Sequence, residues 1–144
     1  MQVKPTWEEI PEFIQLAAKL VEKYPEKFGS IDVTRIVAYG CTNKERPDGK
    51  AKLYDMSGET EPEVFTNSKM YFVKMFMSDW EARNDQSKLL IVASALSRID
   101  PDSPGKVGPL DYRDQSIMVR TFGADWQDRA DVPNLLSDKV DFRE

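Results

Sequence analysis

The chain has 144 residues, of which 40% are hydrophobic and 31% are charged, and its formal net charge is −5. This composition is typical of a globular protein and excludes an intrinsically disordered one, while the length indicates a single domain over residues 1–144. The modest acidity and the scattered lysines and arginines argue against nucleic acid as a partner, because phosphate binding needs clustered basic side chains.

The first predicted element is a helix near the N-terminus. Thr6 and Glu9 have the capping-box spacing, in which each side chain can satisfy an amide at the start of a helix. Apolar residues then recur at helical spacing over residues 10–24, which predicts one buried face. Pro11 fits the first turn of this helix, and Pro25 ends it.

Strands are predicted in the middle of the chain. Residues 33–40 form a run rich in β-branched side chains, and residues 50–56 are a candidate second strand beyond the turn signal at 47–49. Residues 57–67 are polar and are expected to form a loop. The run 70–77 is apolar at both odd and even positions, which favours a strand in the centre of the sheet.

Two further helices are predicted after the strands. Residues 78–81 have another capping-box pattern and indicate a short helical turn. A longer helix should begin at Asn84 or Asp85 and run to about Arg98. Its predicted buried stripe consists of Leu89, Val92, Ala93, Leu96 and Ile99.

The C-terminal third begins with a loop rich in proline and glycine, residues 101–109. Asp111 is expected to cap a last helix that ends at Gly123. The tail from Gln127 is polar and could be extended, with apolar residues between 132 and 136 as anchors. The order of helix, strands, helix, loop and helix predicts an α+β domain.

Neither export nor membrane insertion is expected. The longest apolar run, residues 89–93, is far shorter than the roughly 20 residues that cross a bilayer. Residues 1–5 have no apolar core of the kind found in a signal peptide. Cys41 is the sole cysteine, so no intrachain disulfide can form, which fits a reducing cytoplasm.

The predicted helix that ends near Arg98 has the spacing of a zinc-peptidase helix. Such a helix carries two histidines one turn apart as metal ligands, with a glutamate after the first as general base. Ser94 and Arg98 occupy the two ligand positions here, and Ala95 occupies the position of the base. The chain contains no histidine, so a histidine-ligated zinc centre is excluded.

The same region resembles a known family. The loop 105–110, the helix start 111–114, the segment 122–126 and the tail 132–136 have the pattern of the phage metallopeptidases, small zincin-like proteins of phages and prophages. The likeness spans about residues 10–136. It implies a zincin-like domain, in which a small β-sheet packs against an N-terminal helix, the former metal-site helix and a C-terminal helix.

The resemblance assigns the site position by position. Ser94, Arg98 and Leu110 take the places of the three metal ligands, and Ala95 takes that of the base. Serine is a poor zinc ligand, leucine and alanine offer no lone pair, and Arg98 brings a permanent positive charge. The resemblance therefore implies a pseudoenzyme that binds no metal and needs no cofactor.

Other interpretations of these residues remain. Ser94 and Arg98 are also compatible with ordinary polar positions that face solvent or an ion pair on an amphipathic helix. In a sharper hypothesis, Arg98 pairs with Asp111 or Asp114 in the vacated pocket. A residual hydrolase could instead hold a hard cation with carboxylates. The acidic residues near the former site are Asp100, Asp102, Asp111 and Asp114.

The expected function is binding rather than catalysis. The resemblance implies a phage or prophage protein in the host cytoplasm, which acts on an unknown protein partner, for instance as an inhibitor or adaptor of a host factor. The alternatives are the carboxylate-dependent hydrolase and a structural or assembly protein of the phage. Trp7, Trp80 and Trp126 fall near predicted helix ends and are expected to anchor the core or its boundary.

Overall fold

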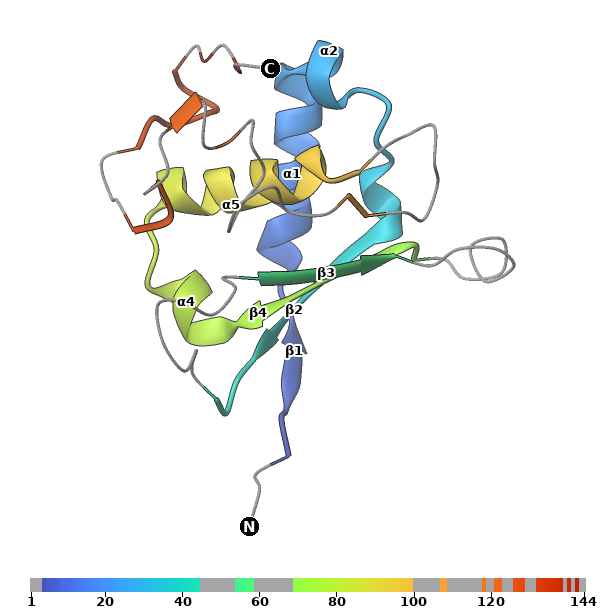
Figure 1. Ribbon diagram of the computed structural model, residues 1–144, viewed down its shortest axis with the longest axis vertical. Helices are drawn as coiled ribbons and strands as arrows, with labels where there is room; N and C mark the ends of the chain where they lie inside the picture. Colours follow the sequence, from blue (N-terminus) through green and yellow to red (C-terminus); the bar gives the residue numbers. More distant parts are fainter. Residues whose placement is uncertain are drawn as a thin grey trace.

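The computed structural model shows an α+β protein in which helices cover one face of a small mixed sheet of four strands (Figure 1). This confirms the fold class that the sequence predicts. The residues that the structure describes are 4–44, 54–58, 69–99, 107–108, 118, 121–122, 126–128, 132–138, 140 and 142.

The chain begins with an edge strand, and this corrects the predicted start of the first helix. β1 is Trp7–Glu9, and α1 is Pro11–Lys23 with the proline in its first turn. The predicted capping box is wrong because Thr6 pairs with a neighbouring segment instead. Its amide donates to Oδ1 of Asn43 at 2.9 Å, and its hydroxyl lies 2.7 Å from that of Thr42.

The sheet has the order β1-β2-β4-β3. Its centre is the parallel pair β2, Ile36–Cys41, and β4, Tyr71–Phe76, in which Ala38 lies opposite Val73. β3, Tyr54–Gly58, pairs antiparallel with β4, and β1 pairs antiparallel with β2. The predicted central place of β4 is confirmed.

Two strand boundaries differ from the prediction. A 3-10 turn, Val33–Arg35, precedes β2, so the strand starts later than its β-branched run. Asp32 stabilises this turn by accepting a hydrogen bond of 3.0 Å from the amide of Thr34. β3 includes Ser57 and Gly58, which were predicted to belong to a loop, because pairing with β4 holds both residues extended.

Within the described residues, three more α-helices follow α1 along the chain. α2, Pro25–Phe28, is a short helix directly after α1, at the proline that ends α1. α4, Met77–Glu81, starts one residue before its predicted capping box, and no side chain caps it. α5, Asp85–Ser97, agrees with the prediction and starts at Asn84, whose side chain accepts a bond of 2.9 Å from Ser87.

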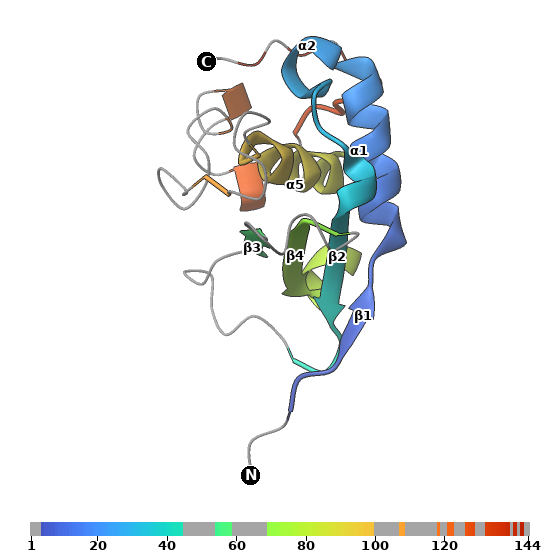
Figure 2. The same cartoon turned by 90° about the vertical axis from the view of Figure 1, so that its right-hand side faces the viewer.

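α5 is buried on all sides in its second half, which corrects the predicted single stripe. Every residue from 89 to 96 is buried, including Ser94. Figure 2 shows α1 and α5 on the same side of the sheet, and α1 packs against both α5 and β2. The core therefore lies between the sheet and these helices, with α5 in its middle.

The described part of the C-terminal segment is folded against the body, so the extended tail is also corrected. Residues 135–138 form a turn, and Val132 and Leu135 are buried, which confirms them as anchors. Lys23 Nζ donates to the carbonyl oxygens of Leu135 and Asp138, both at 2.6 Å. Of the predicted last helix, residues 118 and 121–122 are described, and they are helical.

None of the helices in the described ranges has the length and apolarity needed to cross a bilayer. Two of the three tryptophans occupy the core, as predicted, since Trp80 and Trp126 are buried. Trp7 does not, because it lies on the edge strand β1 and 47% of its surface is exposed.

Candidate functional site

Helix α5 places Ser94 in the core, under the first residue of β3. The side chain of Ser94 is fully buried, and its Oγ lies 2.8 Å from the hydroxyl oxygen of Tyr54. Either hydroxyl can donate in this bond. A buried hydroxyl needs such a partner, because burial without one costs free energy. Tyr54 is itself buried, so the pair is held within the core.

Arg98 is the C-cap residue of α5 and lies one helical turn after Ser94. Its Nε donates to the carbonyl oxygen of Gly108 at 2.8 Å, and the amide of Gly108 donates back to the Arg98 carbonyl at 2.8 Å. The guanidinium carbon lies 5.7 Å from the ring centroid of Tyr54, within the range of a cation–π contact. An isolated bridge between Ile99 and Val107 holds the two segments together.

The helical spacing of Ser94 and Arg98 brings both side chains to Tyr54, and the three residues form what we call the tyrosine cluster. The predicted placement of Ser94 and Arg98 on one face is therefore confirmed. The idea that Ser94 faces solvent is wrong, because α5 is a central helix rather than a surface one. Ala95, at the position of the base, is also buried.

Part of the predicted site lies outside the described residues. This applies to Leu110, to the proposed ion-pair partners Asp111 and Asp114, and to Asp100 and Asp102. The described partners of Arg98 are a backbone carbonyl and an aromatic ring.

The residues of the tyrosine cluster do not fit a zinc ion. The hydroxyls of Tyr54 and Ser94 bond to each other, and the guanidinium of Arg98 repels a dication at short range. Ala95 has no atom that could take a proton from a metal-bound water. Within the described ranges, no three side chains of cysteine, aspartate or glutamate are grouped closely enough to hold a metal ion.

Sequence reasoning missed Tyr54. The alternation of exposed and buried residues in β3 directs Tyr54 and Met56 to the core face, and this alternation is visible in the sequence. What the sequence does not show is that this face meets α5 at Ser94. The tyrosine therefore could have been assigned to the core, but not to the site.

The comparisons with known proteins identify no relative. No family model, no curated protein and no solved structure matches this chain. The likeness to the phage metallopeptidases therefore rests on the residue pattern given above.

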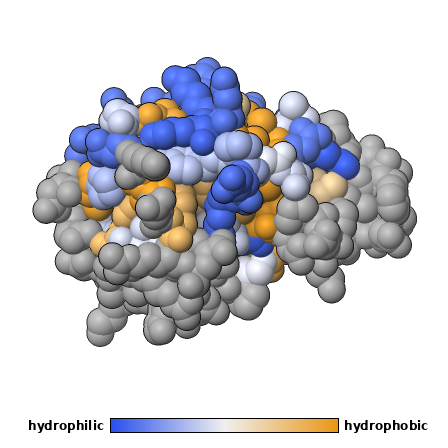
Figure 3. Space-filling model, turned by 90° about the horizontal axis from the view of Figure 1, so that it is seen from above, coloured by the Kyte–Doolittle hydropathy of each residue, from blue (hydrophilic) through white to orange (hydrophobic). Residues whose placement is uncertain are grey.

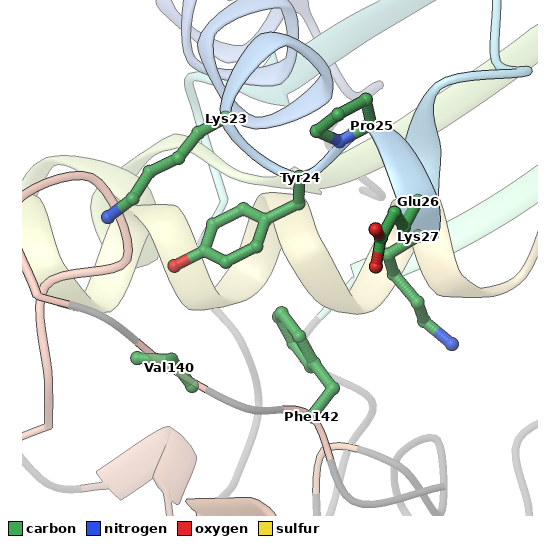
Figure 4. A pocket seen from close by; sticks show the side chains of 7 residues that line it. All are labelled: Lys23, Tyr24, Pro25, Glu26, Lys27, Val140 and Phe142. Atoms are coloured by element: carbon green, nitrogen blue, oxygen red, sulfur yellow. The ribbon is translucent and has the colours of Figure 1, made fainter.

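A separate pocket of about 570 Å³ lies where α1 meets α2, facing the C-terminal segment (Figure 4). The ring centroids of Tyr24 and Phe142 are 5.6 Å apart there in an edge-to-face arrangement. Lys23 and Lys27 extend to opposite sides of the pocket. The ammonium group of Lys23 and the hydroxyl of Tyr24 both bond to the carbonyl oxygen of Leu135, so this wall fastens the C-terminal segment.

The end of the molecule where α2 lies shows both hydrophilic and hydrophobic side chains at its surface (Figure 3). The pocket lining is mixed in the same way, with two lysines and one glutamate beside apolar and aromatic groups. None of the three residues of the tyrosine cluster is among the pocket-lining side chains.

Proposed function

We propose that this chain is a non-catalytic, protein-binding domain with a zincin-like fold, related to the phage metallopeptidases. The observation that carries the proposal is the tyrosine cluster. The two positions that would hold zinc ligands in the family contact Tyr54 instead, one through a buried hydrogen bond and one through a cation–π contact. On this proposal, core packing takes the place of the family's metal site.

The architecture is compatible with this relation. An N-terminal helix, a small mixed sheet and a helix that carries the altered motif occur in the order that the resemblance implies. The origin in a phage or prophage, the host cytoplasm as location, and the role as inhibitor or adaptor of a host factor rest on the resemblance alone.

A metal titration tests the proposal. Wild-type protein and an Arg98→Gln variant are titrated with zinc and magnesium, and the melting temperature and hydrolysis of unfolded casein are followed. Neither protein should gain stability or activity, because removal of the charge alone supplies no ligand. A saturable rise in melting temperature at about one zinc per chain, of the kind a three- or four-ligand site produces, would contradict the proposal.

A second variant tests the fold relation independently. It combines Ser94→His, Arg98→His and Leu110→His with Ala95→Glu, and with Tyr54→Ala to make room for the first imidazole. If the three ligand positions converge as in a zincin, this variant should bind zinc while the wild type does not. If the folded variant binds no more zinc than the wild type, the relation to the metallopeptidases loses its structural basis.

A further inference from the structure

The N-terminal strand β1 forms one edge of the sheet and is exposed at all three of its residues. Trp7 is the one large apolar side chain among the described residues that is exposed, with 47% of its surface accessible. Tryptophan is enriched in the hot spots of protein interfaces. This edge therefore combines an anchor side chain with backbone groups that can pair.

The register shows which backbone groups face outward. The amide of Ile10 donates to the carbonyl of Ala38 at 2.8 Å, and the amide of Thr42 donates to the carbonyl of Thr6 at 2.9 Å. Because bonded and non-bonded pairs alternate in an antiparallel ladder, the backbone groups of Trp7 and Glu9 point away from β2. No other described strand lies on that side of β1.

Side chains hold this edge in place before any partner arrives. Asn43 accepts from the amide of Thr6 and donates to the carbonyl of Lys4, both at 2.9 Å, and so extends the strand pairing beyond β1. The ammonium group of Lys74 lies 5.7 Å from the ring centroid of Trp7. Because the edge is already ordered, less conformational entropy is lost when a partner binds.

The two carboxylates on β1 itself favour a basic partner. Glu8 and Glu9 are exposed and project to opposite faces of the sheet, so both faces of an added strand meet a carboxylate. Lys74 lies two strands away, on the face of Trp7. Pro5 and Pro11 interrupt pairing on either side, which limits the partner to a short segment and disfavours growth into a larger sheet.

We infer that the open edge of β1 binds a short, extended, basic segment of the partner protein by strand addition, with an apolar residue against Trp7. This inference rests on the proposed protein-binding function and names its surface. Backbone hydrogen bonds supply the affinity in this mode, and the side chains on either face supply the selectivity.

Amide hydrogen exchange tests the inference with two probes, a short peptide that alternates valine with lysine and its counterpart with glutamate. At nine-tenths saturation, the lysine peptide should slow exchange at the amides of Trp7 and Glu9 by about tenfold. The tryptophan emission should also shift to the blue, since Trp7 is the exposed tryptophan among three. The glutamate peptide should produce neither change.

A charge-reversal variant, Glu8→Lys with Glu9→Lys, should exchange the preference of the two peptides, and Trp7→Ser should abolish the emission shift. Three results would each overturn the inference: no protection by the lysine peptide, equal protection by both peptides, or protection that rises with protein concentration alone. The last result would assign the edge to a second copy of the chain. Zinc binding or hydrolysis would contradict the proposed function, whereas these three results concern the edge only.

Discussion

The hydrogen bond between Tyr54 and Ser94 joins two hydroxyl groups that lie forty residues apart in the chain and meet inside the core. The guanidinium of Arg98 contacts the ring of Tyr54 and not the tyrosine hydroxyl. The two interactions can therefore be separated by substitution, since a phenylalanine keeps the ring and loses the bond.

Tyr54→Phe and Ser94→Ala should each lower the free energy of unfolding by about 0.5–1.5 kcal/mol, the usual value of a net intramolecular hydrogen bond. The double variant should lose clearly less than the sum, because both substitutions remove the same bond. Urea denaturation of the four proteins in the cycle measures this. If the loss in the double variant equals the sum of the two single losses to within about 0.3–0.5 kcal/mol, the two hydroxyls are not energetically coupled.

Asp32 provides a residue-scale prediction for pH. Hydrogen bonds from the hydroxyl and the amide of Thr34 hold the pKa of Asp32 below its ordinary value, and the charges of Arg35 and Lys69 add to this. A carboxyl whose pKa is lower in the folded state stabilises the protein above its unfolded pKa of about 3.9. That contribution is lost as the pH falls through the folded pKa.

The melting temperature of Asp32→Asn should consequently lie below that of the wild type by a constant amount between about pH 5 and 8, and the two should converge below about pH 4. The corresponding difference in the free energy of unfolding should be small, under about 1 kcal/mol, because Asp32 is exposed and solvent screens its charge interactions. Thermal unfolding across this pH range provides the measurement. A difference that is unchanged at low pH would show that the substitution acts through packing instead.

At the scale of elements, one carboxylate connects three helices. Oε1 of Glu12 on α1 accepts from Trp80 Nε1 on α4 at 3.0 Å and from Lys88 Nζ on α5 at 2.9 Å. The same ammonium group lies 5.3 Å from the centroid of the Trp80 ring. Because Trp80 is buried, the carboxylate satisfies a donor that water reaches poorly.

Glu12→Ala should lower the free energy of unfolding by about 1–3 kcal/mol, since it leaves the indole donor without this acceptor. Lys88→Met should cost less, about 0–1 kcal/mol, as for an ion pair whose acidic partner is half exposed. Glu12→Gln serves as the control because it keeps an acceptor oxygen. Equal losses for Glu12→Ala and Lys88→Met would indicate that the ion pair, and not the indole bond, stabilises the helices.

The elements also show what a sequence pattern can and cannot predict. α5 was predictable because Asn84 caps it and a long apolar run follows. β1 was not, because Thr6 and Glu9 have helix-cap spacing while the strand exists through pairing with β2 and Asn43. Local patterns record capping and periodicity, but strand pairing depends on residues that are distant in the chain.

In the candidate site, too, the local pattern was predictable and the long-range packing was not. The helical period was enough to place Ser94 and Arg98 on one face, and this is what the structure has. Their burial and their shared contact with Tyr54 depend on how α5 packs against β3, which no local pattern encodes. The predicted stripe on α5 was too narrow for the same reason, because a helix in the middle of a core is covered on all sides.

At the scale of the whole molecule, the C-terminal segment fastens the N-terminal helices to the rest of the fold. The ring of Phe142 makes edge-to-face contacts with Tyr24, Phe28 and Phe122 at centroid distances of 5.6, 5.8 and 5.9 Å. The ammonium group of Lys23 meets two carbonyl oxygens of the turn at 135–138. The C-terminal segment thus stabilises the end of α1 and the short helix α2.

Phe142→Ala should lower the free energy of unfolding by about 1–3 kcal/mol, less than a fully buried phenylalanine, because the side chain is partly exposed. Val140 lines the same pocket without an aromatic ring, and Val140→Ala should lower the free energy of unfolding by under about 1.5 kcal/mol. Denaturant unfolding measures both losses, and limited proteolysis should cut the Phe142→Ala variant near its C-terminus first. A loss no greater than that of Val140→Ala would mean that the three ring contacts add nothing.

The parallel pairing of β2 with β4 has a consequence for how the chain folds. Ile36 lies opposite Tyr71 and Trp7 opposite Cys41, so both pairings require the chain to close a long loop before any ladder bond forms. β3 and β4 pair over a shorter separation, and this hairpin can form first. The conformational entropy lost in the long closures should make refolding slower than that of a helical protein of equal length, with the transition state limited by the docking of β2.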